Sequence, residues 1–161
     1  MALLLVAATG CAKSESSEGH ACTLIGTPVG IGVDIAAPMA ARTRAATLLA
    51  CWHGSCTMRT LTLRPTTTEG HPSCTGTQPS DSCSVRSVRT GGKNGFADLP
   101  RLPLKLVRVT LTLTGNGGNV LMHRTLHITP RQTYPNGRTC PSGGAQANVT
   151  VDASGRLSQR H

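Results

Sequence analysis

Two cysteines five positions apart are the residues in this chain whose spacing most directly implies a chemistry. Cys51 and Cys56 enclose Trp-His-Gly-Ser, and His53-Gly54 can form a two-residue turn because glycine tolerates a positive φ. Such a turn pairs residues whose numbers sum to 107, so the two cysteines face each other and can form a cross-strand disulfide. Thiol redox chemistry is the alternative, but the oxidoreductase motif has two intervening residues and begins a helix.

Cys11 follows a short apolar segment and three small residues. Residues 2–9 read ALLLVAAT, which is too short to span a bilayer, and Ala8, Thr9 and Gly10 lead into the cysteine. This sequence resembles the lipobox of bacterial lipoproteins, in which the cysteine thiol receives lipid and the leader is cleaved just before it. It departs from that motif in having Ala8 where leucine is preferred, and in lacking a positively charged start.

The lipobox resemblance implies a division of the N-terminal region. Residues 1–10 would be a lipoprotein signal peptide whose charged start is missing, and Cys11 would be the lipidation site. Residues 11–21 would be a polar tether between the lipid and the folded domain. The protein would then be secreted and anchored by lipid to the outer face of the bacterial cell membrane.

The other six cysteines form an even set, which in an extracytoplasmic domain of this size indicates disulfides. Two of the expected bonds are local in sequence, and the third would tie the first strand to the loop before the last one. The predicted pairs are Cys51–Cys56, Cys74–Cys83 and Cys22–Cys140.

Histidines are the other candidates for chemistry. His123 and His127 share one face of a predicted strand, but four residues of strand rise about 13 Å, which is too far for two ligands of one metal ion. His53 lies in the predicted turn and His71 in a predicted loop. We favour surface or packing roles for these four histidines and expect no cofactor, with an envelope metal site as the alternative.

The charge balance favours anionic partners. The chain carries 16 Lys and Arg against 7 Asp and Glu, a net charge of +9. It has no run of five like charges, and its few aromatic residues do not interleave with basic ones, which argues against a nucleic-acid partner. Either the arginines simply cover solvent faces of strands, or some of them bind an anionic envelope polymer. The candidates for such binding have apolar neighbours of opposite parity: Arg86, Arg89, Arg101 and Arg108.

Catalytic motifs are not evident in the sequence. It contains no Gly-x-Ser-x-Gly nucleophile elbow, and its carboxylates are spread through the expected tether, loops and turns. The glycine-rich residues 115–118 link two predicted strands, so they do not form a phosphate-binding loop between a strand and a helix. We therefore expect the protein not to be an enzyme.

Residues 104–129 form the element that must organise the rest. Apolar residues at 107, 109, 111 and 113 alternate with Arg and Thr, a period of two that predicts a strand with one buried face. Residues 115–119 supply a tight reversal, and the chain returns as a second strand over 120–128. This antiparallel hairpin needs a second apolar surface, so the sequence predicts a β-sandwich.

The remaining elements are predicted from shorter signals. Glycines and Pro28 place a first strand over 22–35 at a sheet edge or a bulge. Residues 36–49 can be read as helix or strand, and we choose a strand for 44–52. The other predictions are a strand over 57–63, a long loop over 64–82, a short edge strand over 84–90 and a last strand over 147–151.

Residues 90–100, TGGKNGFADLP, resemble the turn-glycine, aromatic, Leu-Pro segment of prealbumin-like and Cna-B-type β-sandwich modules. An alternating strand follows in those modules, as 104–113 does here. Some relatives contain a Lys–Asn isopeptide bond, for which Lys93 and Lys105 are present without the accompanying acidic strand motif. The CW-x-G-x-C, Phe-x-x-Leu-Pro, TYPNG-x-x-C and NVTVDASGRL segments also resemble a group of bacterial secreted lipoproteins of uncharacterised function.

These observations predict a single antiparallel, disulfide-stapled β-sandwich of about seven strands, Ig-like or prealbumin-like, over 22–157. A polar tail is expected over 158–161, and the protein is expected to be a monomer. The expected function is that of a non-catalytic, lipid-anchored cell-envelope binding or structural module for an anionic envelope polymer or a partner protein. The alternatives are an envelope metal- or small-molecule-binding protein, and a protease-inhibitor-like protein that acts through the loop 64–82.

Overall fold

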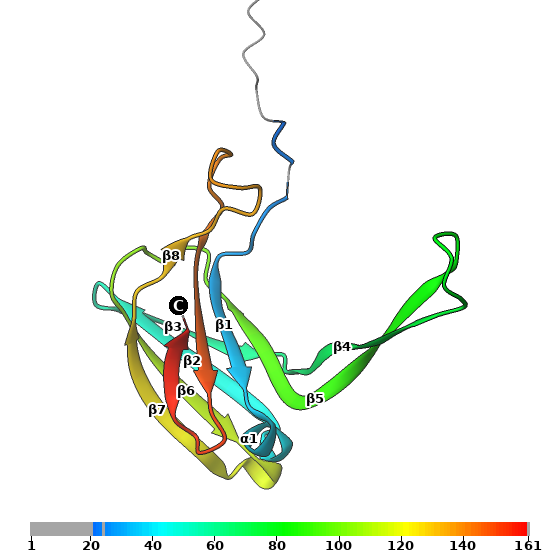
Figure 1. Ribbon diagram of the computed structural model, residues 1–161. Coiled ribbons are helices and arrows are strands. Elements are labelled where there is room, and N and C mark those ends of the chain that lie inside the picture. The colour runs from blue at the N-terminus through cyan, green and yellow to red at the C-terminus, as the bar shows by residue number, and fades with distance from the viewer. Residues whose placement is uncertain (1–20, 24, 161) are drawn as a thin grey trace, which may run out of the picture.

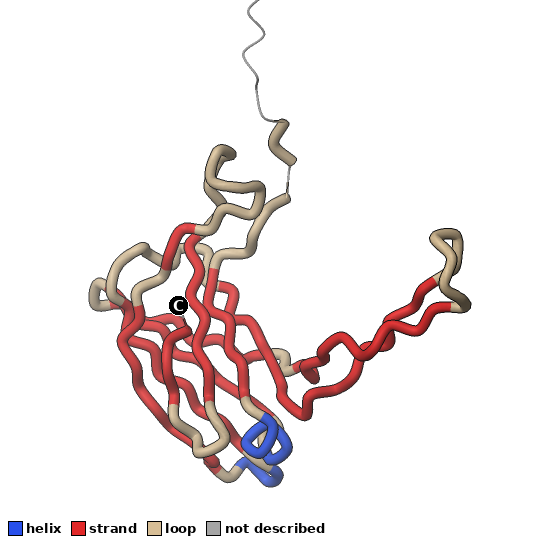
Figure 2. Tube along the Cα trace, in the orientation of Figure 1, coloured by secondary structure: helices blue, strands red, loops and turns tan. Residues whose placement is uncertain are grey.

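The computed structural model describes residues 21–23 and 25–160, and it is built almost entirely from β-strands (Figures 1 and 2). A sandwich was expected and is confirmed, but the described residues form ten strands where about seven were expected. Besides the strands there is one short helix, α1 (Ala37–Arg42), and one 3-10 turn, η1 (Asn116–Gly118). The strands are β1 (Gly30–Ile35), β2 (Ala45–Trp52), β3 (Ser55–Leu61), β4 (Arg64–Cys74), β5 (Cys83–Asp98), β6 (Val107–Thr114), β7 (Val120–Ile128), β8 (Arg131–Gln132), β9 (Ala145–Val151) and β10 (Leu157–Arg160).

The strands form two sheets. The large sheet has the order β10-β9-β1-β5-β4, with β8 also pairing with β9, and the small sheet has the order β3-β2-β6-β7. Neighbouring strands are antiparallel except β1 and β9, which are parallel. The first and last thirds of the chain therefore meet in the middle of the large sheet.

The core lies between the two sheets and follows from the alternation of the strands. Val107, Val109, Leu111 and Leu113 of β6 are fully buried, while the alternate Arg and Thr residues face outward. Aliphatic residues of β1 and β9 cover them from the large sheet. The buried core contains no aromatic ring among the described residues, so aliphatic packing carries the hydrophobic stabilisation.

The two hairpins of the small sheet have the predicted form. In β2–β3, Cys51 faces Cys56 and Ala46 faces Leu61. His53 and Gly54 both have positive φ, 47° and 76°, as a type I′ turn requires. The hairpin of β6 and β7 pairs Val107 with Ile128, which confirms the element on which the fold prediction was built.

The first strand differs from the prediction in length and position. Only residues 30–35 form β1, and this strand lies between β5 and β9 instead of at an edge. Of the glycines that suggested an edge, Gly30 and Gly32 lie on its outer face, where the Phe96 and Asn148 side chains cover the bare backbone. The ambiguous segment 36–49 contains both alternatives, since α1 is followed by β2, and Pro38 is tolerated in the first helical turn because its missing N–H is not needed there.

The segment expected to be a long loop is instead a projecting hairpin. β4 pairs with β5 along its length, and the distal part of the hairpin, residues 66–90, extends away from the sandwich (Figure 1). We call these residues the arm and residues 75–82 its tip. Pro65 and Pro72 are accommodated because β4 is an edge strand whose outer N–H groups need no partner, and the register shifts beside both prolines.

The C-terminal prediction also needs correction. The chain does turn at residues 152–155, but Leu157–Arg160 then returns as β10 and pairs with β9. The residues expected to be a polar tail from 158 onward therefore form an edge strand as far as Arg160. Residue 161 lies outside the described residues.

Three disulfides join the predicted pairs. Cys22 is bonded to Cys140, Cys51 to Cys56 and Cys74 to Cys83, with Cα–Cα distances of 5.8, 4.1 and 4.0 Å. The first ties the segment before β1 to the loop before β9. The third closes the arm at the base of its tip.

Candidate binding site on the large sheet

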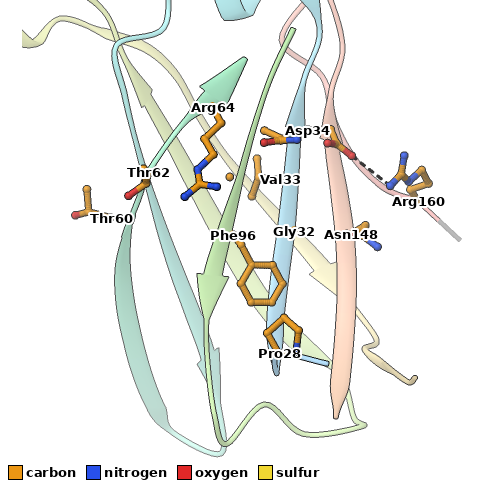
Figure 3. A pocket seen from close by; sticks show the side chains of 12 residues that line it. Pro28, Gly32, Val33, Asp34, Thr60, Thr62, Arg64, Phe96, Asn148 and Arg160 are labelled. Carbon is orange, nitrogen blue, oxygen red and sulfur yellow. Dashed lines mark ion pairs between the residues drawn. The ribbon is translucent and has the colours of Figure 1, made fainter. Parts of the chain in front are cut away.

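A hollow lies on the outer face of the large sheet. Its volume is about 600 Å³, within the range of about 300–1,000 Å³ that is common for small-molecule sites. Strands β1, β5 and β9 form its floor, β4 and β10 contribute from the two sides, and the end of β3 borders it (Figure 3).

Bare backbone forms the centre of the floor. A Cβ placed on Gly32 would lie 2.2 Å from the Asn148 side-chain oxygen, and one placed on Gly30 would lie 2.7 Å from the Phe96 ring. The Asn148 amide and the Phe96 ring therefore occupy the space that side chains on β1 would need. Glycine at these two positions is what lets a ring and an amide lie against the sheet.

Phe96 supplies the apolar surface of the hollow. It faces Gly32 across the β1–β5 pair, and its ring lies beside Pro28 in front of β1 (Figure 3). Phe96 is the one phenylalanine of the chain, and it is 37% exposed instead of being buried in the core. A half-exposed ring fixed over backbone offers a rigid surface on which an apolar ligand face can stack.

Charged groups border this ring. Arg160 of β10 forms an ion pair with Asp34 of β1 at 3.3 Å, and both side chains remain partly exposed, so the pair adds little stability. Arg64 enters from the opposite side, with its guanidinium directed over the floor (Figure 3). Among the described residues the Arg64 side chain forms no hydrogen bond or ion pair, which leaves its planar fork of donors available for a carboxylate or phosphate.

The four arginines predicted as anion ligands do not meet in this hollow. Arg86 and Arg89 lie on the arm, Arg101 on the connection between β5 and β6, and Arg108 on the outer face of the small sheet. Arg64 and Arg160, which do line the hollow, were missed because their segments were assigned to a loop and a tail. Recognising both segments as edge strands of one sheet would have identified them.

The four histidines are placed differently from one another. His53 and His127 line a second hollow of about 380 Å³, together with Trp52, Arg108 and the Cys51–Cys56 disulfide. His123 lies on the same outward face of β7 as His127, and its Nδ1 is 2.9 Å from Thr112 Oγ1. His71 lies on the arm. Within residues 21–23 and 25–160 no three His, Cys, Asp or Glu side chains are grouped as metal ligands.

The fold and its disulfides define an all-β, disulfide-bonded sandwich with a polar hollow on one sheet and a projecting hairpin. Comparison with known protein families, curated proteins and solved structures finds no match. The predicted lipid site, Cys11, lies outside the described residues. In the described part of the chain no helix is both long enough and apolar enough to cross a membrane.

Proposed function

We propose that the protein is a non-catalytic cell-envelope binding module that recognises an acidic polysaccharide through the hollow on the large sheet. The observation that carries this proposal is that one hollow is lined by the half-exposed Phe96 ring and by the guanidinium of Arg64, which has no partner among the described residues. Three disulfides indicate an extracytoplasmic domain, which is where such polymers occur.

The chemistry of an acidic sugar matches the two sides of the hollow. The C–H face of a pyranose ring is apolar and stacks on an aromatic ring, while its hydroxyl groups need polar partners. A carboxylate on the sugar would accept two hydrogen bonds from Arg64. The Asp34 carboxylate and the Asn148 amide would accept hydrogen bonds from its hydroxyls.

The overall charge supports the same partner. A net charge of +9 raises the local concentration of a polyanion and speeds its association. Lipid on Cys11 would keep the module at the outer face of the membrane, within reach of envelope polymers.

Calorimetric titration with oligogalacturonate and with an uncharged glucose oligomer of equal length tests the proposal. The comparison uses wild type, Arg64→Gln, Phe96→Leu and a control, Arg89→Gln, which removes the same charge from the arm. We expect Arg64→Gln to weaken binding of the acidic oligomer by about tenfold or more, because a charge-assisted hydrogen bond is lost. Phe96→Leu should weaken the binding of both oligomers. Arg89→Gln should change the affinity by less than about twofold, because the charge of Arg89 is distant from the hollow and screened. Equal effects of Arg64→Gln and Arg89→Gln, or no binding by the wild type, would reject the site.

A second candidate function concerns the arm. The Cys74–Cys83 disulfide closes the base of the tip, and within the tip Asp81 N–H donates to Gln78 O at 3.0 Å while Gln78 N–H donates to the Asp81 carboxylate at 2.6 Å. A loop held in one conformation loses little entropy on binding, as in proteins that present a rigid loop to a protease or another protein. This favours a protein partner at the tip.

Site-specific crosslinking distinguishes this second function. A photo-crosslinking residue at Gln78 should give a discrete protein adduct on intact cells. The same residue at Asn116, in the turn between β6 and β7 and far from the tip, should not. Absence of an adduct at Gln78, or the same adduct at both positions, would reject a partner at the tip.

A further inference from the structure

One end of the sandwich gathers four segments that are far apart in the sequence. Gly30 of β1 pairs with Asp98 of β5, so the residues before β1 and the connection 99–106 lie together. That connection leads into Val107, which pairs with Ile128, and the β2–β3 turn lies beside them because Cys51 pairs with Arg108. The loop 133–144 follows β8 at the same end (Figure 1). We call this the tether end of the sandwich.

The name reflects where the chain enters the fold. The disulfide between Cys22 and Cys140 fixes the first described residues to the loop 133–144. If Cys11 carries lipid, the ten residues that follow it can span at most about 35 Å when fully extended. The tether end would then be the part of the sandwich nearest to the bilayer.

Large apolar side chains are exposed at the tether end. Leu104 is 49% exposed and Leu106 is 64% exposed, although both belong to a connection only eight residues long. Ile25 and Tyr134 are also exposed there. Two exposed leucines only two positions apart leave apolar surface in water, which would be stabilised if another surface covered them.

Cationic side chains alternate with these leucines. Arg101, Lys105 and Arg108 are all exposed and lie within the same few residues of chain. Arg138 lies 5.3 Å from the centre of the Tyr134 ring, which adds a further cation to this end. The opposite end also carries arginines, but its exposed large apolar side chain is Val120 alone among the described residues. Exposed leucines and clustered cations thus occur together at the tether end.

We propose that the tether end docks directly onto the anionic surface of a lipid bilayer. Leu104 and Leu106 insert at the boundary between headgroups and acyl chains, and Arg101, Lys105 and Arg108 contact lipid phosphates. Apolar side chains interspersed with cations are the pattern by which interfacial segments bind anionic membranes, and two such signals together give stable binding. This inference goes beyond the proposed function, because it involves neither the hollow on the large sheet nor the tip of the arm.

Membrane docking would also determine how the rest of the molecule is presented. The sheet faces run along the strands, away from the tether end, so the hollow would face sideways above the membrane. A lipid on Cys11 would raise the effective concentration of the tether end at the bilayer, which makes even weak contacts persistent.

Vesicle co-sedimentation tests the proposal with the full chain carrying Cys11→Ser, which removes the lipid site and leaves every other segment in place. The probes are vesicles of phosphatidylcholine with about 30% phosphatidylglycerol and vesicles of phosphatidylcholine alone. We expect Leu104→Ser/Leu106→Ser and Arg101→Gln/Lys105→Gln each to lower the partition coefficient on anionic vesicles by about tenfold. The controls, Val120→Ser and Arg42→Gln/Arg124→Gln, remove an exposed apolar side chain and two positive charges away from the tether end. They should leave the partition coefficient within about twofold, because these residues would not contact the lipid headgroups and their charges are screened over that distance.

A second measurement reports insertion itself. In the same Cys11→Ser background, with the chain's own tryptophan also replaced (Trp52→Phe), Leu106→Trp should show a blue-shifted emission and quenching by brominated lipid on anionic vesicles, and Val120→Trp should show neither. Equal behaviour of the two tryptophan variants, or equal loss of partitioning in the tether-end variants and their controls, would overturn the proposal.

Discussion

The Phe96 ring covers the bare backbone of Gly30. A Cβ at Gly30 would lie 2.7 Å from one ring carbon and 2.0 Å from the carbonyl oxygen of Ala97. The ring can move, but the carbonyl belongs to the neighbouring strand β5 and cannot move without disturbing the sheet.

Gly30→Ala is therefore expected to lower the free energy of unfolding by about 1–3 kcal/mol, since a methyl group is forced into a filled space. Urea denaturation followed by circular dichroism measures this. Gly26→Ala is the matched control, because a Cβ there meets nothing within 4 Å. If Gly30→Ala and Gly26→Ala were equally stable, the close packing of β1 against Phe96 and β5 would be wrong.

The three disulfides are expected to differ in how much they stabilise the fold. Cys22 and Cys140 are 118 residues apart, and Cys51 and Cys56 only 5. In the chain-entropy description the first restricts the unfolded chain by about 5 kcal/mol and the second by about 2 kcal/mol. Paired replacement by alanine should thus lower Tm more for Cys22/Cys140 than for Cys51/Cys56. The reverse order in calorimetry would show that the long-range bond is not the main constraint.

Asp152 is expected to make the free energy of unfolding depend on pH. Hydrogen bonds to its carboxylate from the Ser154 hydroxyl and the Arg156 backbone N–H, together with a second bond from the Ser154 N–H, hold the pKa of Asp152 below its ordinary value of 3.8. Because the pKa of Asp152 is lower in the folded state, its ionised carboxylate stabilises the fold at pH values above its pKa in the unfolded state. This stabilisation is lost as the pH falls through the pKa of the folded state. Asp152→Asn should consequently be less stable than wild type near pH 7, and the difference should shrink below about pH 4. A difference that does not change between these pH values would contradict the assignment.

Cys11 is predicted to carry lipid. Metabolic labelling with a fatty-acid analogue, in bacteria that express the protein behind a standard lipoprotein signal peptide, should mark wild type and not Cys11→Ser. Labelling of both to the same extent would show that Cys11 is not the lipid site. The predicted binding of the tether end to vesicles would not be affected by that result.

The local hairpins could be predicted from sequence because their signals are local. The His53-Gly54 turn and the two facing cysteines determine the register of β2 and β3, and the strict alternation in 107–113 determines which face of β6 is buried. Two of the disulfides, Cys51–Cys56 and Cys74–Cys83, could be predicted because their cysteines are close together in the sequence. For the third, the prediction followed from the position of Cys140 just before the last predicted strand.

The arm and the hollow could not be predicted, for two physical reasons. Pro65, Gly70 and Pro72 are residues that usually break strands, and only their position on an edge strand makes them acceptable in β4. The side chains around the hollow come from β1, β4, β5, β9 and β10, whose order in the sheet has no counterpart in the sequence. Arg64 and Arg160 lie on one face only because of that order.

The parallel pair of β1 and β9 has a consequence for the biosynthesis of the protein. Gly30 pairs with Gln146, so the centre of the large sheet cannot be completed until nearly the whole chain has been synthesised. Contacts so distant in sequence form slowly, because a long loop must close before any of them contributes. Until then β1 lacks one of its two neighbouring strands in the large sheet. Cys22 can likewise join Cys140 only after the chain has been synthesised beyond residue 140.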